Sequence, residues 1–367
     1  MKKLLLLAAA AVAFGANAQT LTQSWNVDTK TLATAEVRQG VGMGGKIYIN
    51  NKADQKVYVV DQNGISANTL PGGKNTGITI DEAGNLVVAN STFPNKWGVD
   101  SALLVYNPST PESMTALSFT EDLAAMGRCD WLSKAKGNMA GDGQILLVGG
   151  ASTGISKLVV ADGETSADDS FVASVEGLGF GSSVVVQPFM DGADQKYLYV
   201  NRSAAPAIIT EDGDNFAVEK TMAWEDKGAS NGTDIFTLGG KKYVVYPTLA
   251  NYLDGFAIAC LDAELPDTVK TIPLVVKKEA TLGANPNGYQ ANWVNAEVVS
   301  ETKAIIYHYV PGAYAEAYTF EIPGEPQTGI NDVNAASDVK VRKVYENGQV
   351  YIIKGDVKYN MMGAQVK

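Results

Sequence analysis

The sequence predicts an all-β chain, arranged as a six-bladed β-propeller with a small β module after it. One observation behind this prediction is a strand–turn–strand pattern that recurs six times along the chain. Another is that no stretch has the apolar spacing of a long helix. A third is that the last copy ends one strand short, whereas residues 21–27 read as a spare strand. We expect residues 19–325 to form the propeller.

The clearest copy of the pattern is residues 75–107, which we take as the template of a blade. Its apolar residues alternate with small or polar ones, as in strands whose two faces differ; they are Ile78, Ile80, Leu86, Val88, Leu103 and Val105. Residues 81–84, Asp-Glu-Ala-Gly, have the composition of a tight turn, because Asp caps the local backbone and Gly adopts positive φ easily. This copy therefore predicts a hairpin followed by a loop and a third strand.

Six second strands can be aligned on a β-branched or aromatic run that follows a glycine or polar turn. Their first apolar residues are Ile47, Leu86, Ile145, Tyr197, Tyr243 and Ile305. The spacing is close to the roughly 40 to 50 residues of known four-stranded blades, with loop insertions making up the excess. A third strand ending in an acidic or amide residue follows each of them; these residues are Asp61, Asn107, Asp162, Asp212, Asp262 and Glu321.

The N-terminal strand has a specific place in this scheme. The sixth copy runs out of chain before a fourth strand, and residues 21–27 can supply one. We expect this strand to close the last blade, because closure removes the unpaired strand edges that promote aggregation.

Residues 77–90, GITIDEAGNLVVAN, also resemble the NHL-type propeller repeat. In that repeat an apolar inner strand, an acidic-glycine turn and a Gly-Asn-Leu/Ile-x-Val-Ala strand follow in this order. The resemblance, which this one copy carries, implies a six-bladed propeller.

The chain changes character at about residues 323–327, and we expect residues 326–367 to form a linker and a separate β segment. Residues 329–367 hold six basic and four acidic side chains, whereas the chain as a whole is acidic. Apolar residues alternate on both sides of a Lys-Gly-Asp turn and predict a hairpin; they are Val350, Ile352, Val357 and Tyr359. An ordinary C-terminal hairpin packed on the propeller is the alternative interpretation.

Three pieces of this tail resemble the short variant of the C-terminal sorting segment of the type IX secretion system. They are Glu346–Ile353, Val357–Asn360 and Gly363–Lys367. The resemblance implies a small β-sandwich that the outer-membrane secretion machinery of a Gram-negative bacterium recognises. It also implies that the protein is secreted or held at the outer cell surface.

Residues 1–18 have the features of a secretory signal peptide. Lys2 and Lys3 precede an apolar run, and Ala16-Asn17-Ala18 is a small-x-small cleavage site. No later apolar run reaches the roughly 20 residues of a membrane helix, so we expect no membrane span.

Charge and cysteine content narrow the possible partners. Without the two leader lysines, 27 basic side chains face 40 acidic ones, which argues against nucleic acid as a partner. Cys129 and Cys260 are the only cysteines, and we expect them to be separate buried thiols in different blades.

Two catalytic motifs occur in the wrong context. Residues 40–46, GVGMGGK, have phosphate-loop spacing, but Ile47 follows where Ser or Thr is needed, so we interpret them as a glycine-rich turn. Residues 150–154 fit G-x-S-x-G, but a strand follows instead of a helix. The only histidine, His308, lies within an apolar strand, and we expect it to be packed there.

The candidate binding site lies on the first strand of each blade, since first strands line the channel of a propeller. Polar residues and two tryptophans occur there and can converge at one end of the channel, with a loop tyrosine extending the surface. The candidate ligand-binding residues are Arg38, Arg128, Asp130, Trp131, Asp234, Tyr289, Asn292 and Trp293. The alternative is that these side chains only satisfy one another and channel waters.

Three functional hypotheses follow. The first is a secreted or cell-surface protein that binds an extracellular glycan, peptide or partner protein, without catalysis and without a cofactor. The second is a divalent-metal-dependent lactonase or lyase of the propeller type, with Ca²⁺ held by Asp130, Asp234 or Asn292. The third is a passive surface or matrix component.

Overall fold

The computed structural model describes most of the chain from residue 19 onward. The described residues are 19–32, 36–91, 100–119, 129–148, 154–174, 178, 184–201, 205–213, 215–224, 232–248, 255–263, 271–272, 274–278, 292–323, 341–346, 349–354, 357–360 and 365–366. The chain divides into two compact units, Met1–Pro323 and Gly324–Lys367. None of the described residues belongs to a helix long and apolar enough to span a bilayer.

In the described part of the first unit, six antiparallel sheets follow one another along the chain. The first is β2 (Gly40–Met43), β3 (Lys46–Asn51) and β4 (Lys56–Asp61), with β5 (Gly64–Ile65) and β6 (Leu70–Pro71) both paired to β4. The second is β7 (Ile78–Ile80), β8 (Leu86–Asn90), β9 (Ala102–Tyr106) and β10 (Thr115–Ser118), with the short 3₁₀ helix η1 (Pro111–Ser113) between the last two strands. The third is β11 (Lys136–Gly137), β12 (Gly143–Leu147) and β13 (Gly154–Ala161), with β14 (Glu164–Thr165) and β15 (Phe171–Ser174) both paired to β13.

The remaining three sheets repeat the arrangement. The fourth is β16 (Val185–Asp191), β17 (Asp194–Val200), β18 (Ala207–Asp212) and β19 (Asn215–Thr221). The fifth is β21 (Asp234–Leu238), β22 (Lys241–Thr248), β23 (Gly255–Cys260) and β25 (Leu274–Lys278). The sixth is β26 (Trp293–Ser300), β27 (Lys303–Val310), β28 (Tyr314–Glu321) and β1 (Thr20–Asp28). A parallel pair, β20 (Ala223–Trp224) and β24 (Thr271–Ile272), lies outside these sheets.

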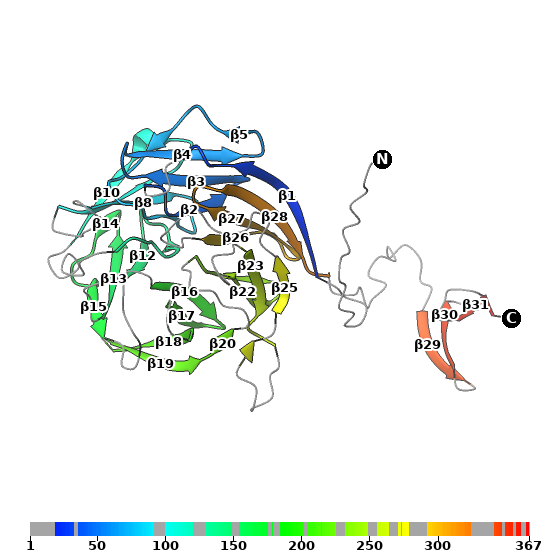
Figure 1. The fold of residues 1–367 in the computed structure, drawn as a ribbon. Helices are drawn as coiled ribbons and strands as arrows, with labels where there is room; N and C mark the ends of the chain where they lie inside the picture. The colour runs from blue at the N-terminus through cyan, green and yellow to red at the C-terminus, as the bar shows by residue number, and fades with distance from the viewer. Residues whose placement is uncertain are drawn as a thin grey trace, which may run out of the picture. The chain divides into compact units, whose positions relative to one another are not determined.

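The first unit is a β-propeller, as the sequence predicts. In Figure 1 the sheets follow one another around a ring, with β2, β16 and β26 toward its middle and β5, β15 and β19 at its rim. The expected closing strand is confirmed: β1 pairs antiparallel with β28 from Thr20 opposite Glu321 to Asp28 opposite Tyr314. The N-terminal and C-terminal strands of this unit therefore share one sheet.

The core consists of apolar interfaces between neighbouring sheets. Each consecutive pair of sheets shares a cluster of buried side chains. The cluster that closes the ring joins Ile47 and Ile49 of the first sheet to Tyr307 and Tyr309 of the last. Because successive side chains of a strand point to opposite faces, a strand covered on both faces is apolar along its length, as the burial of β8 from Leu86 through Ala89 shows.

One expected turn is a strand in the structure. Gly40–Met43 form β2, and only Gly44 and Gly45, with φ of 61° and 78°, make the turn before β3. A Cβ atom at Gly42 would overlap the ring of Tyr307. The glycine is thus needed for the approach of the last sheet to the first, which is a contact between distant parts of the chain.

The second unit contains a small antiparallel sheet, as expected of a C-terminal β module. Its strands are β29 (Val341–Glu346), β30 (Gln349–Lys354), β31 (Val357–Asn360) and β32 (Gln365–Val366), paired in chain order. The pairing of Lys354 with Val357 places a hairpin where the sequence predicts one.

Candidate functional site

The expected polar residues Arg38, Asp130, Asp234 and Asn292, which the structure describes, lie near the starts of the innermost strands, at one end of the channel. Arg38, just before β2, pairs with Asp130, just before β11, with 3.3 Å between Nη1 and Oδ2, and both side chains are buried. Gln39 bridges the same elements, donating to the carbonyl of Leu132 and accepting from the backbone N–H groups of Leu132 and Ile78. These contacts join the first three sheets across the hub.

Trp131 and Trp293 lie at this same end, which we call the tryptophan end. Their ring centroids are 5.2 Å apart at a tilt of 46°, and they pack with Val185. Each residue is only 5% exposed, and the adjoining cavity has a volume of ≈ 20 Å³, about enough for one water. Among the described residues neither indole N–H has a hydrogen-bond partner. The two rings therefore fill the channel and present little face for stacking on a sugar.

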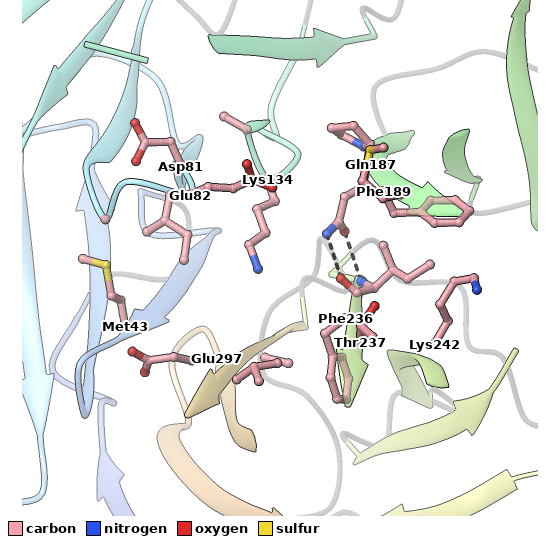
Figure 2. A pocket seen from close by; sticks show the side chains of 18 residues that line it. Met43, Asp81, Glu82, Lys134, Gln187, Phe189, Phe236, Thr237, Lys242 and Glu297 are labelled. Atoms are coloured by element: carbon pink, nitrogen blue, oxygen red, sulfur yellow. Dashed lines mark hydrogen bonds between the residues drawn. The ribbon is translucent and has the colours of Figure 1, made fainter. Parts of the chain in front are cut away.

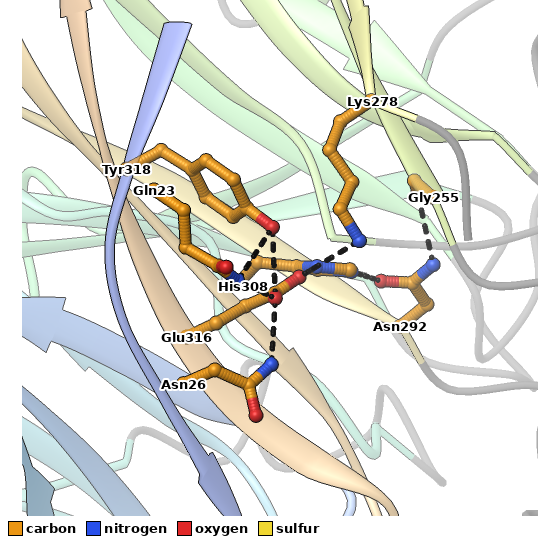
Figure 3. A network of polar contacts seen from close by, with 8 residues as sticks. All are labelled: Gln23, Asn26, Gly255, Lys278, Asn292, His308, Glu316 and Tyr318. Carbon is orange, nitrogen blue, oxygen red and sulfur yellow. Dashed lines mark hydrogen bonds and ion pairs between the residues drawn. The ribbon is translucent and has the colours of Figure 1, made fainter. Parts of the chain in front are cut away.

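Asn292 belongs to a buried polar network that ties the tryptophan end to the closing strand (Figure 3). Its Oδ1 lies 2.6 Å from Nε2 of His308, and its Nδ2 donates to the carbonyl of Gly255. Nδ1 of His308 lies 2.7 Å from Oε1 of Glu316, and Nζ of Lys278 lies 3.3 Å from the same oxygen. Asn292, His308 and Glu316 are all fully buried. His308 is thus packed in its strand, as expected, but also bonded at both ring nitrogens.

The other oxygen of Glu316 holds strand β1. Gln23 and Asn26 of β1 each donate a hydrogen bond of 2.9 Å to Oε2, and the hydroxyl of Tyr318 donates to it over 2.8 Å. Burial by itself would raise the pKa of Glu316, but the hydrogen bond to His308, then the charge of Lys278 and the hydrogen bond from Tyr318, lower that pKa to about 2. Burial lowers the pKa of His308. Glu316 is therefore an ionised acceptor that anchors the strand closing the ring.

Asp234 is also held by neighbouring side chains. Its carboxylate accepts a hydrogen bond from Gln187, another of 2.9 Å from the N–H of Ala296, and lies 3.5 Å from Nζ of Lys134. The cations beside Asp234 and beside Asp130 disfavour a second, divalent cation at either carboxylate. In the described ranges no three acidic, histidine or cysteine side chains gather as metal ligands.

Two expected site residues, Arg128 and Tyr289, lie outside the described residues.

The cysteines lie in different parts of the fold. Cys129 is buried ahead of β11, whereas Cys260 is half-buried at the end of β23, and neither forms a disulfide.

A second channel cavity is at the opposite end, which we call the hairpin end because the turns after the innermost strands surround it (Figure 2). Its volume is ≈ 480 Å³. Glu297 belongs to β26, Glu82 lies in the turn between β7 and β8, and the phenyl rings of Phe189 and Phe236 belong to β16 and β21. The side chains on which its chemistry depends are Met43, Glu82, Lys134, Phe189, Phe236, Thr237, Lys242 and Glu297.

Three acidic side chains line this cavity: Asp81 is bonded through both oxygens, whereas Glu82 and Glu297 are each bonded through one. Oε2 of Glu82 accepts from the N–H of Gly137 at 2.9 Å. Oε2 of Glu297 accepts from the N–H of Gly44 at 2.9 Å and from the hydroxyl of Tyr307 at 2.6 Å. Within the described part of the chain, Oε1 of neither carboxylate has a hydrogen-bond partner. These two oxygens can therefore accept hydrogen bonds from a ligand.

The basic side chains of the cavity are paired with acids. Lys134 lies 3.5 Å from Asp234, and Lys242 lies 3.0 Å from Asp191 and 3.3 Å from Asp262. Each lysine charge is thus already opposed by a carboxylate.

Sequence reasoning missed the hairpin end because its residues look like ordinary turn residues. The signal that could have found them is their place in the repeat: Met43, Glu82, Met190, Thr237 and Val298 all lie near the turn between first and second strands. Aligning the copies on this turn would have brought them to one end of the channel.

Comparisons with known proteins bear on the fold. No protein-family profile and no curated protein matches the chain. Among solved structures, a DUF4623 family protein from Bacteroides eggerthii DSM 20697 matches with a TM-score of 0.59 and 12% identity, over 80% of this chain and 72% of that one. A subtype N10 neuraminidase-like protein of A/little yellow-shouldered bat/Guatemala/060/2010 matches with a TM-score of 0.47 and 10% identity, over 83% of this chain and 100% of that one. At such identities the likeness to the first of these shows a shared fold alone.

Proposed function

We propose that this protein is a secreted or cell-surface propeller that binds a glycan, a peptide or a partner protein at its hub, without catalysis. The observation that carries the proposal is the ≈ 480 Å³ cavity at the hairpin end, which combines aromatic walls with carboxylate oxygens directed at no protein group in the described ranges. A concave, partly apolar site with a few polar groups is the usual form of a ligand site.

The tryptophan end is the second candidate site. The two indole N–H groups without a partner in the described ranges favour it, because buried donors are usually satisfied. The ring faces, however, are covered by each other and by Val185, and the adjoining space is ≈ 20 Å³. We therefore place the ligand at the hairpin end.

The metal-dependent hydrolase is less well supported. Its expected ligands Asp130, Asp234 and Asn292 are engaged in different contacts, with Arg38, with Lys134 and with His308 respectively. Binding a divalent ion there would require breaking these contacts and placing the ion beside a cation.

We further propose that the NHL-like pattern reflects the repeat of this propeller and that the two ends of the chain direct export. Residues 1–18 would be removed as a leader, and the C-terminal segment would be recognised by type IX secretion machinery. Intact mass of the secreted protein tests removal of the leader, and a secretion assay of a C-terminal deletion tests the sorting role. Cleavage after Ala18 is expected, and loss of secretion is expected when residues 326–367 are deleted.

The binding proposal is tested with the variant Thr237→Trp, which places a large ring into the cavity from an exposed position of β21. The matched control is Thr221→Trp, at an exposed position of β19 away from the cavity. Both variants and the parent protein are applied to arrays of glycans and peptides. Thr237→Trp should lose the bound spots that the parent and Thr221→Trp retain. Equal binding by all three proteins would exclude the hairpin end as the site.

A further inference from the structure

The charge inside the hairpin-end cavity is unbalanced. Lys134 is opposed by Asp234, and Lys242 is opposed by Asp191 and Asp262, so neither lysine contributes an unopposed positive charge. Glu82 and Glu297 form no ion pair within the described part of the chain. The cavity therefore has a net attraction for a cation, and the excess of acidic side chains over the whole protein adds to it.

The lining of the hairpin-end cavity favours a ligand that carries one polar group with apolar groups on either side of it. Phe189, Phe236 and Met43 line the wall, and Met190 and Val298 stand at the edge, each 45% exposed. These two are among the six large apolar side chains exposed in the described ranges. A cluster of exposed apolar side chains around one cavity is typical of a surface that contacts another chain.

The chemistry of the two carboxylates is specific enough to name the group. Each offers one oxygen whose position is fixed by hydrogen bonds to the other: Glu82 by Gly137, and Glu297 by Gly44 and Tyr307. Fixed carboxylate oxygens form strong charge-assisted hydrogen bonds with ammonium or guanidinium donors. The alkyl stem of a lysine or arginine also packs well against phenyl rings and methionine.

We propose that the hairpin-end cavity takes a lysine or arginine side chain of a peptide segment whose neighbouring residues are apolar. The basic group bonds to Oε1 of Glu82 or of Glu297, and the apolar neighbours contact Met190 and Val298 at the edge. This inference rests on the proposed function and names the ligand class of the same site.

The test uses fluorescence anisotropy with the full secreted protein and three labelled peptides of one leucine- and valine-rich frame. The first carries two arginines, the second carries citrulline in their place, and the third carries glutamate. The arginine peptide should bind, the citrulline peptide should bind about tenfold or more weakly, and the glutamate peptide should bind weakest, because citrulline keeps the shape and loses the charge. Raising the salt from about 50 mM to about 500 mM should weaken only the arginine peptide.

The protein variants report on the same contact. Glu82→Gln with Glu297→Gln should weaken the arginine peptide about tenfold or more and leave the citrulline peptide unchanged. The matched control, Glu112→Gln with Glu164→Gln, removes the same charge at exposed positions outside the cavity and should behave as the parent. Glu82→Gln alone, in an exposed turn, serves if the double variant melts early.

The outcomes separate the two proposals. Equal binding of arginine and citrulline peptides, or no effect of the glutamine variants, would overturn the basic-group assignment, and so would the absence of binding by all three peptides. If Thr237→Trp still abolishes binding of the ligand found on the arrays after any of these results, the cavity stands as the ligand site. If peptides bind but Thr237→Trp leaves their affinity unchanged, the site itself is wrongly placed.

Discussion

The two ends of the hub differ in how their polar groups are satisfied. At the tryptophan end, charged and amide side chains bond to one another: Arg38 to Asp130, and Asn292 to His308, which in turn contacts Glu316. At the hairpin end, Glu82 and Glu297 each keep an oxygen without a partner in the described ranges. The first arrangement holds the ring together, whereas the second leaves capacity for a ligand. Polar residues in a channel are therefore not by themselves a sign of a binding site.

The tryptophan end is also connected to ring closure. Asn292, beside Trp293, contacts His308, and Glu316 carries the contacts onward to Gln23 and Asn26 of the closing strand. Substitutions in this network should affect stability, and substitutions at the hairpin end should affect binding. This contrast can be tested in the following order of expected effect.

The largest effect is expected from Glu316→Gln. The substitution removes the buried carboxylate charge beside Lys278 and His308 and weakens two bonds to β1, so the free energy of unfolding should fall by about 3–5 kcal/mol. Denaturant unfolding followed by circular dichroism measures it. The control is Glu321→Gln, which breaks the exposed pair with Lys303 and should cost about 1 kcal/mol or less. Equal effects of the two substitutions would contradict the anchoring role of Glu316.

The second effect is the dependence of stability on pH. The pKa of Glu316 is about 2 in the folded protein against an ordinary value of 4.5. Because the folded pKa is depressed, the stabilisation is complete above about pH 4.5 and is lost as the pH falls toward 2, by about 3 kcal/mol. The difference in unfolding free energy between parent and Glu316→Gln should therefore shrink over this window. A difference that stays constant from pH 6 down to about pH 2.5 would argue against an ionised Glu316.

The smallest effect on stability is expected from Trp131→Phe combined with Trp293→Phe. The pair keeps an aromatic filling of the channel, so we expect a loss of about 1–3 kcal/mol. Binding of the ligand that Thr237→Trp blocks should stay within about twofold of the parent. The reason is that both indole rings are buried, at 5% exposure, and a ligand in solution does not reach them. A titration of that ligand into the double variant checks this. Loss of binding in a folded double variant would move the site to the tryptophan end.

Much of the fold could be predicted from the sequence because its signals are local. Alternation of apolar residues, as in Ile78 and Ile80, and turns such as the one at Gly84 depend on neighbours in the chain. The place of strand β1 was also predictable, since the last copy of the repeat lacks a fourth strand and the N-terminal strand can pair with it. The exception is β2, whose glycines have the composition of a turn. They are required there because the ring of Tyr307, which is distant in the sequence, leaves no room for a Cβ atom.

The candidate site was less predictable because it forms only where residues from distant parts of the sequence come together in the fold. Trp131 and Trp293 do meet, as expected, but the sequence does not show that they cover each other. Glu82 and Glu297 resemble ordinary hairpin residues, and they become neighbours of one cavity only when the ring closes. The role of Glu316 likewise requires β1, β27 and β28 to be placed side by side.

The most direct test of the account is to map where a ligand touches the hub. The arginine peptide, carrying a photoreactive group, is crosslinked to the secreted protein, and the modified residues are identified by mass spectrometry. The account predicts adducts on hairpin-end residues such as Met43, Met190 and Val298, and their loss in Thr237→Trp. Adducts on Trp131 or Trp293 that persist in Thr237→Trp would contradict it.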